Sequence, residues 1–311
     1  MRIKFLAVPL VLASCGGASE PAGPAMVAGF DPEPPAAGFT RFVAPIIPGI
    51  KSGEDTTYCQ WISAPSDREL SVVRFKGLQS HFGHHVVVYA NKLVAPVGTS
   101  RPCTSNDMLS VRFVGATPGE GAVKFDLPAG VVFRIPAGEA LMVNTHFINT
   151  SLKPVDGQAL IDLELRDAAD TDRVAGAFAN YSQSFVVTPG QTATADTNCV
   201  VKHDMTFIVF SNHMHEWGKS AYSEVVRADG SREMLTRDDT WNAERVFDPQ
   251  WTSWTEAGAM KVKTGDTIHT RCTWENTTAT DLEFPKEMCV GFGFYLPGGP
   301  EVNCGDGAWD E

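Results

Sequence analysis

Positive charge and long apolar runs are both scarce in this sequence, and each absence excludes a class of function. The chain has 25 Lys and Arg against 37 Asp and Glu, with a formal net charge of −12, so it lacks the basic surface that neutralises nucleic-acid phosphates. Beyond the N-terminus, no apolar run approaches the roughly 20 residues that span a bilayer. Because 43% of the residues are hydrophobic, the chain is also not mainly disordered. We predict a soluble globular body that binds no nucleic acid.

Helical periodicity is missing as well. No window of about a dozen residues repeats its apolar side chains with the helical period. Short β-branched and aromatic runs occur instead, separated by turn formers such as Pro128-Ala129-Gly130 and Asp229-Gly230, and this spacing predicts an all-β protein built of antiparallel sandwiches. The predicted strands cover 70–75, 86–90, 131–135, 141–148, 160–165, 206–211 and 290–296.

A polar stretch at 166–173 interrupts the strand pattern near the middle of the chain. This stretch is the best candidate for a domain boundary, because each half then holds about 130 residues, which suits one β-sandwich. We place an N-terminal domain at 39–170 and a C-terminal domain at 171–311.

The first 38 residues are predicted to contain a targeting signal and a flexible tether. Arg2 and Lys4 precede an apolar stretch at 5–12, and Leu-Ala-Ser-Cys at 12–15 resembles the lipobox cleaved by bacterial lipoprotein signal peptidase. An ordinary secretory signal with a chance cysteine is the alternative. We predict a signal peptide at 1–14, a lipidated Cys15 and a flexible tether at 15–38, rich in Gly, Ala and Pro. The protein is then expected in the bacterial cell envelope, held at the membrane only by lipid and facing the periplasm or the exterior.

Six cysteines remain once Cys15 is set aside, and an even number in an exported chain indicates disulfides. Six cysteines allow fifteen pairings. Because two lie before residue 110 and four after residue 198, we expect one bridge in the N-terminal domain and two in the C-terminal domain. The six are Cys59, Cys103, Cys199, Cys272, Cys289 and Cys304.

Two histidines at the end of a predicted strand form a ready-made chelate. His213 and His215 lie two residues apart, so both rings can reach one ion while Met214 turns away. A buried histidine is more often a hydrogen-bonded part of the core, and for this pair the two interpretations are evenly balanced.

Three further histidines are weaker candidates when taken one at a time. His84 and His85 are adjacent, so they can share an ion only at a strand start or a bulge, which Gly83 permits. His146 lies inside the predicted strand 141–148. The role of His81, three residues before His84, stays open between a solvated side chain and a third ligand.

Four segments carry a further signal. They are Gly-His-His-Val-Val-Val-Tyr at 83–89, Asn-Thr-His-Phe at 144–147, His-Met-His-Glu-Trp-Gly-Lys at 213–219 and Glu-Met-Cys-Val at 287–290. With Asp-Thr-Thr-Tyr-Cys at 55–59, they resemble, in order and separation, the copper type II, ascorbate-dependent monooxygenases, the family of peptidylglycine α-hydroxylating monooxygenase and dopamine β-monooxygenase. The resemblance covers roughly residues 39 to 305 and agrees with the strand pattern, since it implies two jelly-roll-like β-sandwiches that face each other across a cleft.

The resemblance also implies a ligand set and a disulfide pairing. Two copper ions per chain are expected, and the second is the catalytic one. The first would be held by His84, His85 and His146, and the second by His213, His215 and Met288. The implied bridges are Cys59–Cys103, Cys199–Cys304 and Cys272–Cys289. We expect Asn144, Asn212 or Glu216 to orient the rings.

Three positions depart from the peptide-amidating members of this family. Ser211, Val290 and Phe292 replace the Arg, Asn and Tyr that hold or assist the substrate carboxylate there. Since neither a hydroxyl nor a phenyl ring substitutes for a guanidinium fork, a glycine-extended peptide is not the expected substrate.

The resulting prediction is a monomeric dicopper monooxygenase. It would hydroxylate a C–H bond of an unidentified small molecule with dioxygen and an external, ascorbate-like reductant. Two alternatives remain: a copper-binding or electron-relay envelope protein without hydroxylase activity, and a zinc hydrolase with a three-histidine site.

Overall fold

The computed structural model describes residues 25–91, 95–104, 107, 111–118, 127–246, 249–255, 258–284, 286–299 and 301–311. The predicted signal peptide, Cys15 and the first part of the predicted tether lie outside the described residues. The described residues form strands and a one-turn 3₁₀ helix, η2 (Ala243–Val246), so the all-β fold class is confirmed. None of the helical segments in these ranges is long and apolar enough to cross a membrane.

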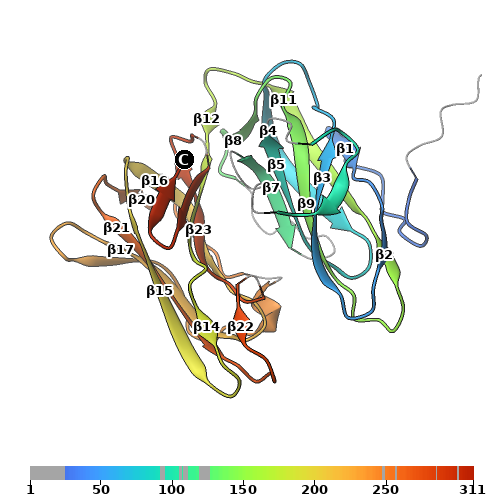
Figure 1. The fold of residues 1–311 in the computed structure, drawn as a ribbon. Helices are drawn as coiled ribbons and strands as arrows, with labels where there is room; N and C mark the ends of the chain where they lie inside the picture. Colours follow the sequence, from blue (N-terminus) through green and yellow to red (C-terminus); the bar gives the residue numbers. More distant parts are fainter. Residues whose placement is uncertain are drawn as a thin grey trace, which may run out of the picture.

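The N-terminal strands form two sheets that share an apolar core (Figure 1). One sheet has the order β1-β11-β4-β8-β12 and the other the order β6-β3-β9-β5-β7, while β2 pairs with β10. All pairings are antiparallel except that of β8 with β12. The strands are β1 (Phe39–Val43), β2 (Ile47–Ile50), β3 (Asp55–Ile62), β4 (Leu70–Gln79), β5 (Gly83–Asn91), β6 (Ser100–Pro102), β7 (Val111–Pro118), β8 (Val131–Ile135), β9 (Ala140–Ile148), β10 (Val155–Gly157), β11 (Ala159–Asp167) and β12 (Arg173–Val174).

The C-terminal strands repeat this arrangement with a second pair of sheets. One sheet has the order β19-β16-β23-β13-β24-β25, with β20 beside β16, and the other the order β15-β21-β17-β18. The strands are β13 (Gly176–Ser182), β14 (Val186–Val187), β15 (Thr192–Val200), β16 (Met205–His213), β17 (Gly218–Val226), β18 (Arg232–Asp238), β19 (Thr252–Ser253), β20 (Met260–Val262), β21 (Thr267–Glu275), β22 (Leu282–Glu283), β23 (Cys289–Leu296), β24 (Val302–Gly305) and β25 (Ala308–Asp310).

The two pairs of sheets lie side by side (Figure 1), and aromatic side chains of the two pairs are in contact. In the described part of the chain, no strand of one set pairs with a strand of the other. The rings of Phe113 and Phe133 lie 4.9 and 5.1 Å from the ring of Phe294, and these residues belong to one continuous apolar core. This aromatic contact holds the two halves in a fixed relative position, and so determines which side chains face each other at the junction.

All seven predicted strands are present, most of them a few residues longer than predicted. Strand β8 has the predicted bounds, 131–135. The turn glycines have the expected left-handed backbone, with φ of 77° at Gly130 and 83° at Gly230, which costs glycine little. The structure contains the three disulfides Cys59–Cys103, Cys199–Cys304 and Cys272–Cys289, so the pairing implied by the resemblance is confirmed.

Strand alternation decides which side chains face the junction. On β5, Val86, Val88 and Ala90 point into the N-terminal core, so the residues between them point the other way. Those residues, His85, Val87 and Tyr89, line a pocket between the two halves. On β23 the same alternation brings Val290, Phe292 and Phe294 to that pocket.

Candidate metal centre

The start of β5 brings two adjacent histidine rings together. The register of β5 against β9 shifts between Gly83 and His85, so the predicted strand start with a bulge is confirmed. The Nδ1 atoms of His84 and His85 lie 3.2 Å apart, which matches two imidazole ligands on one ion at the usual bond length of about 2.0 Å. A side chain at Gly83 would not fit, because a Cβ there would lie 2.3 Å from Cβ of Gln79.

His146 completes this first set from β9. Its ring lies 4.6 Å from the ring of His84 and 5.0 Å from that of His85. Nε2 of His146 donates to Oδ1 of Asp55 on β3 at 2.5 Å, and this hydrogen bond lowers the pKa of Asp55. Since the proton is then on Nε2, the lone pair of Nδ1 is available. One ligand atom from each of the three rings lies within 4.8 Å of the others, so the set can hold an ion.

The second set comes from the end of β16 and the loop that follows. The rings of His213 and His215 lie 5.1 Å apart. Met214, which separates them in the sequence, turns away and is fully buried in the hydrophobic core. Nδ1 of His215 donates to the carbonyl oxygen of Lys286 at 3.0 Å. Nε2 of His215 is buried and has no hydrogen-bond partner among the described residues. A metal ion would satisfy such a nitrogen.

A buried carboxylate ties this loop to the segment that carries Met288. Oε2 of Glu287 accepts the backbone N–H of His215 at 3.0 Å, and Oε1 accepts that of Trp217 at 2.8 Å. Oε2 also accepts the indole N–H of Trp274 at 2.9 Å and the backbone N–H of Met288 at 3.2 Å. Burial raises the pKa of Glu287 even though all these bonds lower it. Glu287 is therefore the main support of the second set.

Met288 faces the same pocket as His213 and His85. The next residue, Cys289, is bridged to Cys272 on β21, so the position of Met288 is fixed from both sides. The structure thus brings together the three histidines assigned to the first copper. Of the residues assigned to the second, it pairs the rings of His213 and His215 and places His213 and Met288 on the lining of one pocket.

The two sets also lie close to each other. The rings of His84 and His215 are 6.4 Å apart, little more than the 5.1 Å within the His213–His215 pair. Burial lowers the pKa of His84 to about 3, with smaller contributions from His146 and His215. Burial likewise lowers the pKa of His85 and of His213 well below the usual value. These rings are neutral near pH 7, the form that binds metal.

The residues expected to orient the rings make other contacts. The amide of Asn144 donates to Sγ of Cys103 at 3.5 Å, and Oδ1 of Asn212 accepts the hydroxyl of Ser223 at 2.7 Å. Glu216 is exposed. Neither Asn212 nor Glu216 bonds to a histidine ring within the described ranges, so that expectation is wrong for both.

Sequence reasoning missed the residues that do this work. Asp55 and the carbonyl of Lys286 orient His146 and His215, and Glu287 holds the loop. Asp55 was visible only as the first residue of a recognised segment, and its pairing partner lies 91 residues away. His81 is exposed and is not part of the described three-histidine group.

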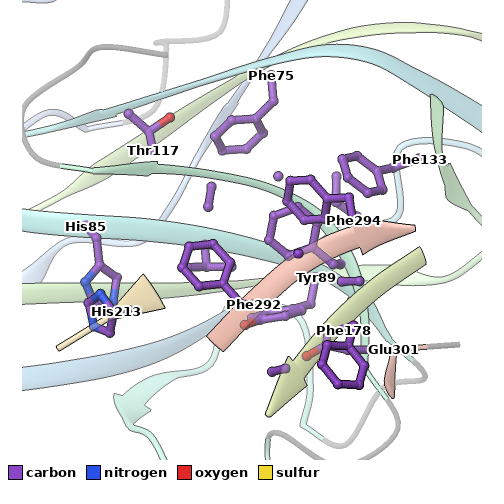
Figure 2. Close-up of a pocket in the computed structure, with 18 of the residues that line it drawn as sticks. Phe75, His85, Tyr89, Thr117, Phe133, Phe178, His213, Phe292, Phe294 and Glu301 are labelled. Carbon is purple, nitrogen blue, oxygen red and sulfur yellow. The ribbon is translucent and has the colours of Figure 1, made fainter. Parts of the chain in front are cut away.

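The pocket beside the two sets has a volume of about 370 Å³, within the usual range for small-molecule sites. Figure 2 shows His85 and His213 together on one side of it and aromatic rings around the rest. Val290 and Phe292 line the pocket, whereas the hydroxyl of Ser211 donates to the carbonyl of Gln250 at 2.9 Å. Two of the three positions that depart from the peptide-amidating pattern, Val290 and Phe292, therefore give the pocket an apolar wall.

These observations define a class of protein: a double β-sandwich with buried histidines gathered where the halves meet. Residues 174–308 match the family model of the copper type II ascorbate-dependent monooxygenase, C-terminal domain. This part of the chain, which carries His213, His215 and Met288, is similar to that domain, and the resemblance is confirmed there.

Other comparisons add nothing to this assignment. No curated protein matches the chain. Among solved structures, the chain is similar to PNGase F, a glycosylasparaginase from Flavobacterium meningosepticum, at 9% identity over 88% of this chain and 98% of that chain, with a TM-score of 0.37. It is also similar to PBCV-1 VP54 fitted into a reconstruction of the virophage Sputnik, at 8% identity over 83% and 93% of the two chains, with a TM-score of 0.30. Similarities this weak carry no argument about fold or function.

Proposed function

We propose that this protein is a copper monooxygenase that hydroxylates a C–H bond of a small molecule. The reaction consumes dioxygen and two electrons and two protons from an ascorbate-like reductant; one oxygen atom enters the substrate and the other leaves as water. The observation that carries the proposal is the meeting of both histidine sets at one side of an apolar pocket. The family match of residues 174–308 supports the choice of metal.

The donor set fits copper. Nδ1 atoms of His84 and His85 converge, and Nε2 of His215 is buried without a partner in the described part of the chain. Imidazole suits both oxidation states of copper, and the thioether of Met288 favours the reduced one. When bound, copper would supply one-electron chemistry with dioxygen. We propose two ions per chain, one held by His84, His85 and His146 and the other by His213, His215 and Met288.

The chain's own groups prepare the site for this chemistry. Asp55 holds the Nε2 proton of His146, and the carbonyl of Lys286 holds the Nδ1 proton of His215, so each ring presents its other nitrogen. Glu287 keeps the loop and Met288 in place. The aromatic wall excludes water and orients an apolar substrate beside His213.

The two alternative functions explain less of the structure. An electron relay needs no pocket of about 370 Å³ next to His213 and Met288. A zinc hydrolase needs no thioether, since zinc sites in proteins use Cys, His, Asp and Glu. The monooxygenase accounts for both features.

The proposal is tested with copper-loaded protein, ascorbate and ¹⁸O₂ in the presence of a panel of small aryl and alkyl compounds. We expect one ¹⁸O atom in a product whose formation matches oxygen consumption. Met288→Ile should keep the fold, at a cost below about 1.5 kcal/mol, and abolish the product. Absence of ¹⁸O from every product, or full turnover by Met288→Ile, would overturn the proposal.

We also propose that the protein is a monomer anchored to a bacterial envelope membrane through lipid on Cys15. Changing Cys15 to Ser should move the protein from the membrane fraction to the soluble fraction. Retention of the variant at the membrane would contradict the anchor.

A further inference from the structure

The pocket has a second polar end, away from the histidines. Figure 2 shows Glu301 beside Phe178, on the opposite side of the pocket from His85 and His213. Tyr89 lies four residues after His85 on β5, and at the usual rise this places their Cα atoms about 13 Å apart. Tyr89 and Glu301 both line the pocket, and the charge of Glu301 adds to the effect of burial in raising the pKa of Tyr89.

Glu301 is the only carboxylate among the described residues that line the pocket. Its Oε2 atom is buried and has no hydrogen-bond partner among the described residues. Oε1 has only a long contact, 3.4 Å, from Nδ2 of Asn303. A buried polar atom without a hydrogen-bond partner lowers the stability of the folded protein. The presence of the Glu301 carboxylate in an otherwise apolar lining therefore points to a function.

The backbone holds Glu301 firmly at this place. It immediately precedes β24, which pairs with β13 so that Val302 lies opposite Phe178. Cys304 on β24 is bridged to Cys199. Burial raises the pKa of Glu301 to about 7, and burial together with the charge of Glu301 raises that of Tyr89. Burial is the first cause of both shifts, in agreement with the buried Oε2 atom of Glu301.

The charge of the pocket supports one kind of occupant. The cation among the described lining residues is Arg74, and it is ion-paired with Glu164 on the neighbouring strand β11. Nothing in the described lining offsets Glu301, whereas the wall between it and the histidines is aromatic and aliphatic. A molecule that is apolar along its length and carries one hydrogen-bond donor at its end would complement this pattern.

We propose that Glu301 is the specificity-determining residue of the pocket and accepts a hydrogen bond from the head group of an otherwise apolar substrate, which thereby points its far end at His213. The head group is a hydroxyl or an ammonium, which share this donor chemistry. The inference rests on the proposed function only for the oxidation of the far end, because the binding itself is tested without turnover.

Binding is measured by calorimetry with three probes of similar shape: 4-phenylbutan-1-ol, 4-phenylbutan-1-amine and the methyl ether of the alcohol, which lacks a donor. Above pH 7, where the Glu301 carboxyl group is ionised, we expect wild-type protein to bind the alcohol or the amine at least about tenfold more tightly than the ether, as for a hydrogen bond to a charged group. In Glu301→Leu this preference should disappear while the ether still binds.

A second variant separates the two head groups and guards against misfolding. Glu301→Gln keeps the size and an acceptor oxygen but removes the charge, so it should weaken the amine about tenfold and the alcohol much less. Glu33→Gln, which changes an exposed carboxylate far along the chain, is the control and should leave all three affinities unchanged.

The outcomes distinguish this inference from the proposed function. If the donor preference survives in both Glu301 variants, or if no probe binds saturably, the inference is wrong. If the preference depends on Glu301 but ¹⁸O never enters a product, the inference stands and the monooxygenase proposal fails.

Discussion

The two histidine sets are built in different ways. The first set lies on adjacent strands of one sheet, where His84 and His85 follow Gly83 at the start of β5 and His146 lies opposite on β9. The second set has one ring at a strand end and one in a loop, and a single carboxylate, Glu287, holds that loop. The first set is preorganised by sheet hydrogen bonds, whereas the second depends on one buried side chain. Loss of a supporting side chain should therefore affect copper affinity and stability more strongly in the second set than in the first.

Removal of a ring from the second set should have the largest effect. His213→Ala should reduce the copper content from two ions to about one and leave the His84, His85 and His146 set loaded. Activity should fall by more than about 100-fold, beyond the range typical for loss of a group that only supports a ligand. Elemental analysis with spectroscopy of the remaining ion checks this. A wild-type content near one, or loss of both ions in the variant, would contradict two independent sets.

Loss of the Glu287 carboxylate should come next. Glu287→Gln keeps the volume but places an amide NH₂ among four donors, the N–H groups of His215, Trp217, Met288 and Trp274. The expected cost is about 3–4 kcal/mol of stability and about 10–100-fold in copper affinity of the second set alone. Denaturant unfolding and copper titration measure both. Equal weakening of the two sets would show that they are not held separately.

The opposite end of the pocket should respond to pH in a way that neither set does. The folded-state pKa of Glu301 is about 7 against a reference value of 4.5. Below pH 4.5 the Glu301 carboxyl group is protonated in both the folded and the unfolded protein, so it does not change the free energy of unfolding. Between pH 4.5 and about pH 7 the folded protein keeps this proton while the unfolded protein releases it, so stability falls as the pH rises. Glu301→Gln should thus be more stable than wild type above pH 7, by up to about 3 kcal/mol, and equal to it at pH 4. Melting curves across this range test it, and a pH-independent difference would contradict the burial of the charge.

The smallest effect is expected for the support of the first set. Asp55→Asn keeps the shape but removes the charge that holds the Nε2 proton of His146. Because the sheet already positions the ring, copper affinity of the first set should fall only about tenfold, at the low end for such partners. Stability should change little, because the Asp55 side chain is 61% exposed. If Asp55→Asn proved as damaging as Glu287→Gln, the contrast between the two sets would be lost.

Local sequence was enough to predict part of this structure. The strands with continuous apolar or aromatic runs, such as β8 and β23, were predictable, because burial on both faces leaves a strong signal. Strand β15 (Thr192–Val200) was not, since its exposed and half-buried positions carry Thr, Ala, Asp and Asn. Its pairing with β21 over nine residues depends on tertiary contacts that no local pattern shows.

The candidate site divides in the same way. Spacing identified His213 and His215, and the bulge at Gly83 explained how His84 and His85 meet. Met288 came only from the family resemblance. Glu301 was not predicted at all, because what sets it apart is an environment formed by strands from both halves of the chain.

The aromatic contact between the halves has a consequence for producing fragments of the protein. Phe113, Phe133 and Phe294 pack against one another across the junction. If the chain were divided after β12 and the halves expressed separately, each half would expose to solvent the aromatic side chains that the other half normally covers. Exposed apolar surfaces of this kind promote aggregation. The match at 174–308 therefore marks a unit of sequence similarity. Soluble protein that can bind its ligands should require expression of both halves as one chain, or refolding of the two halves together.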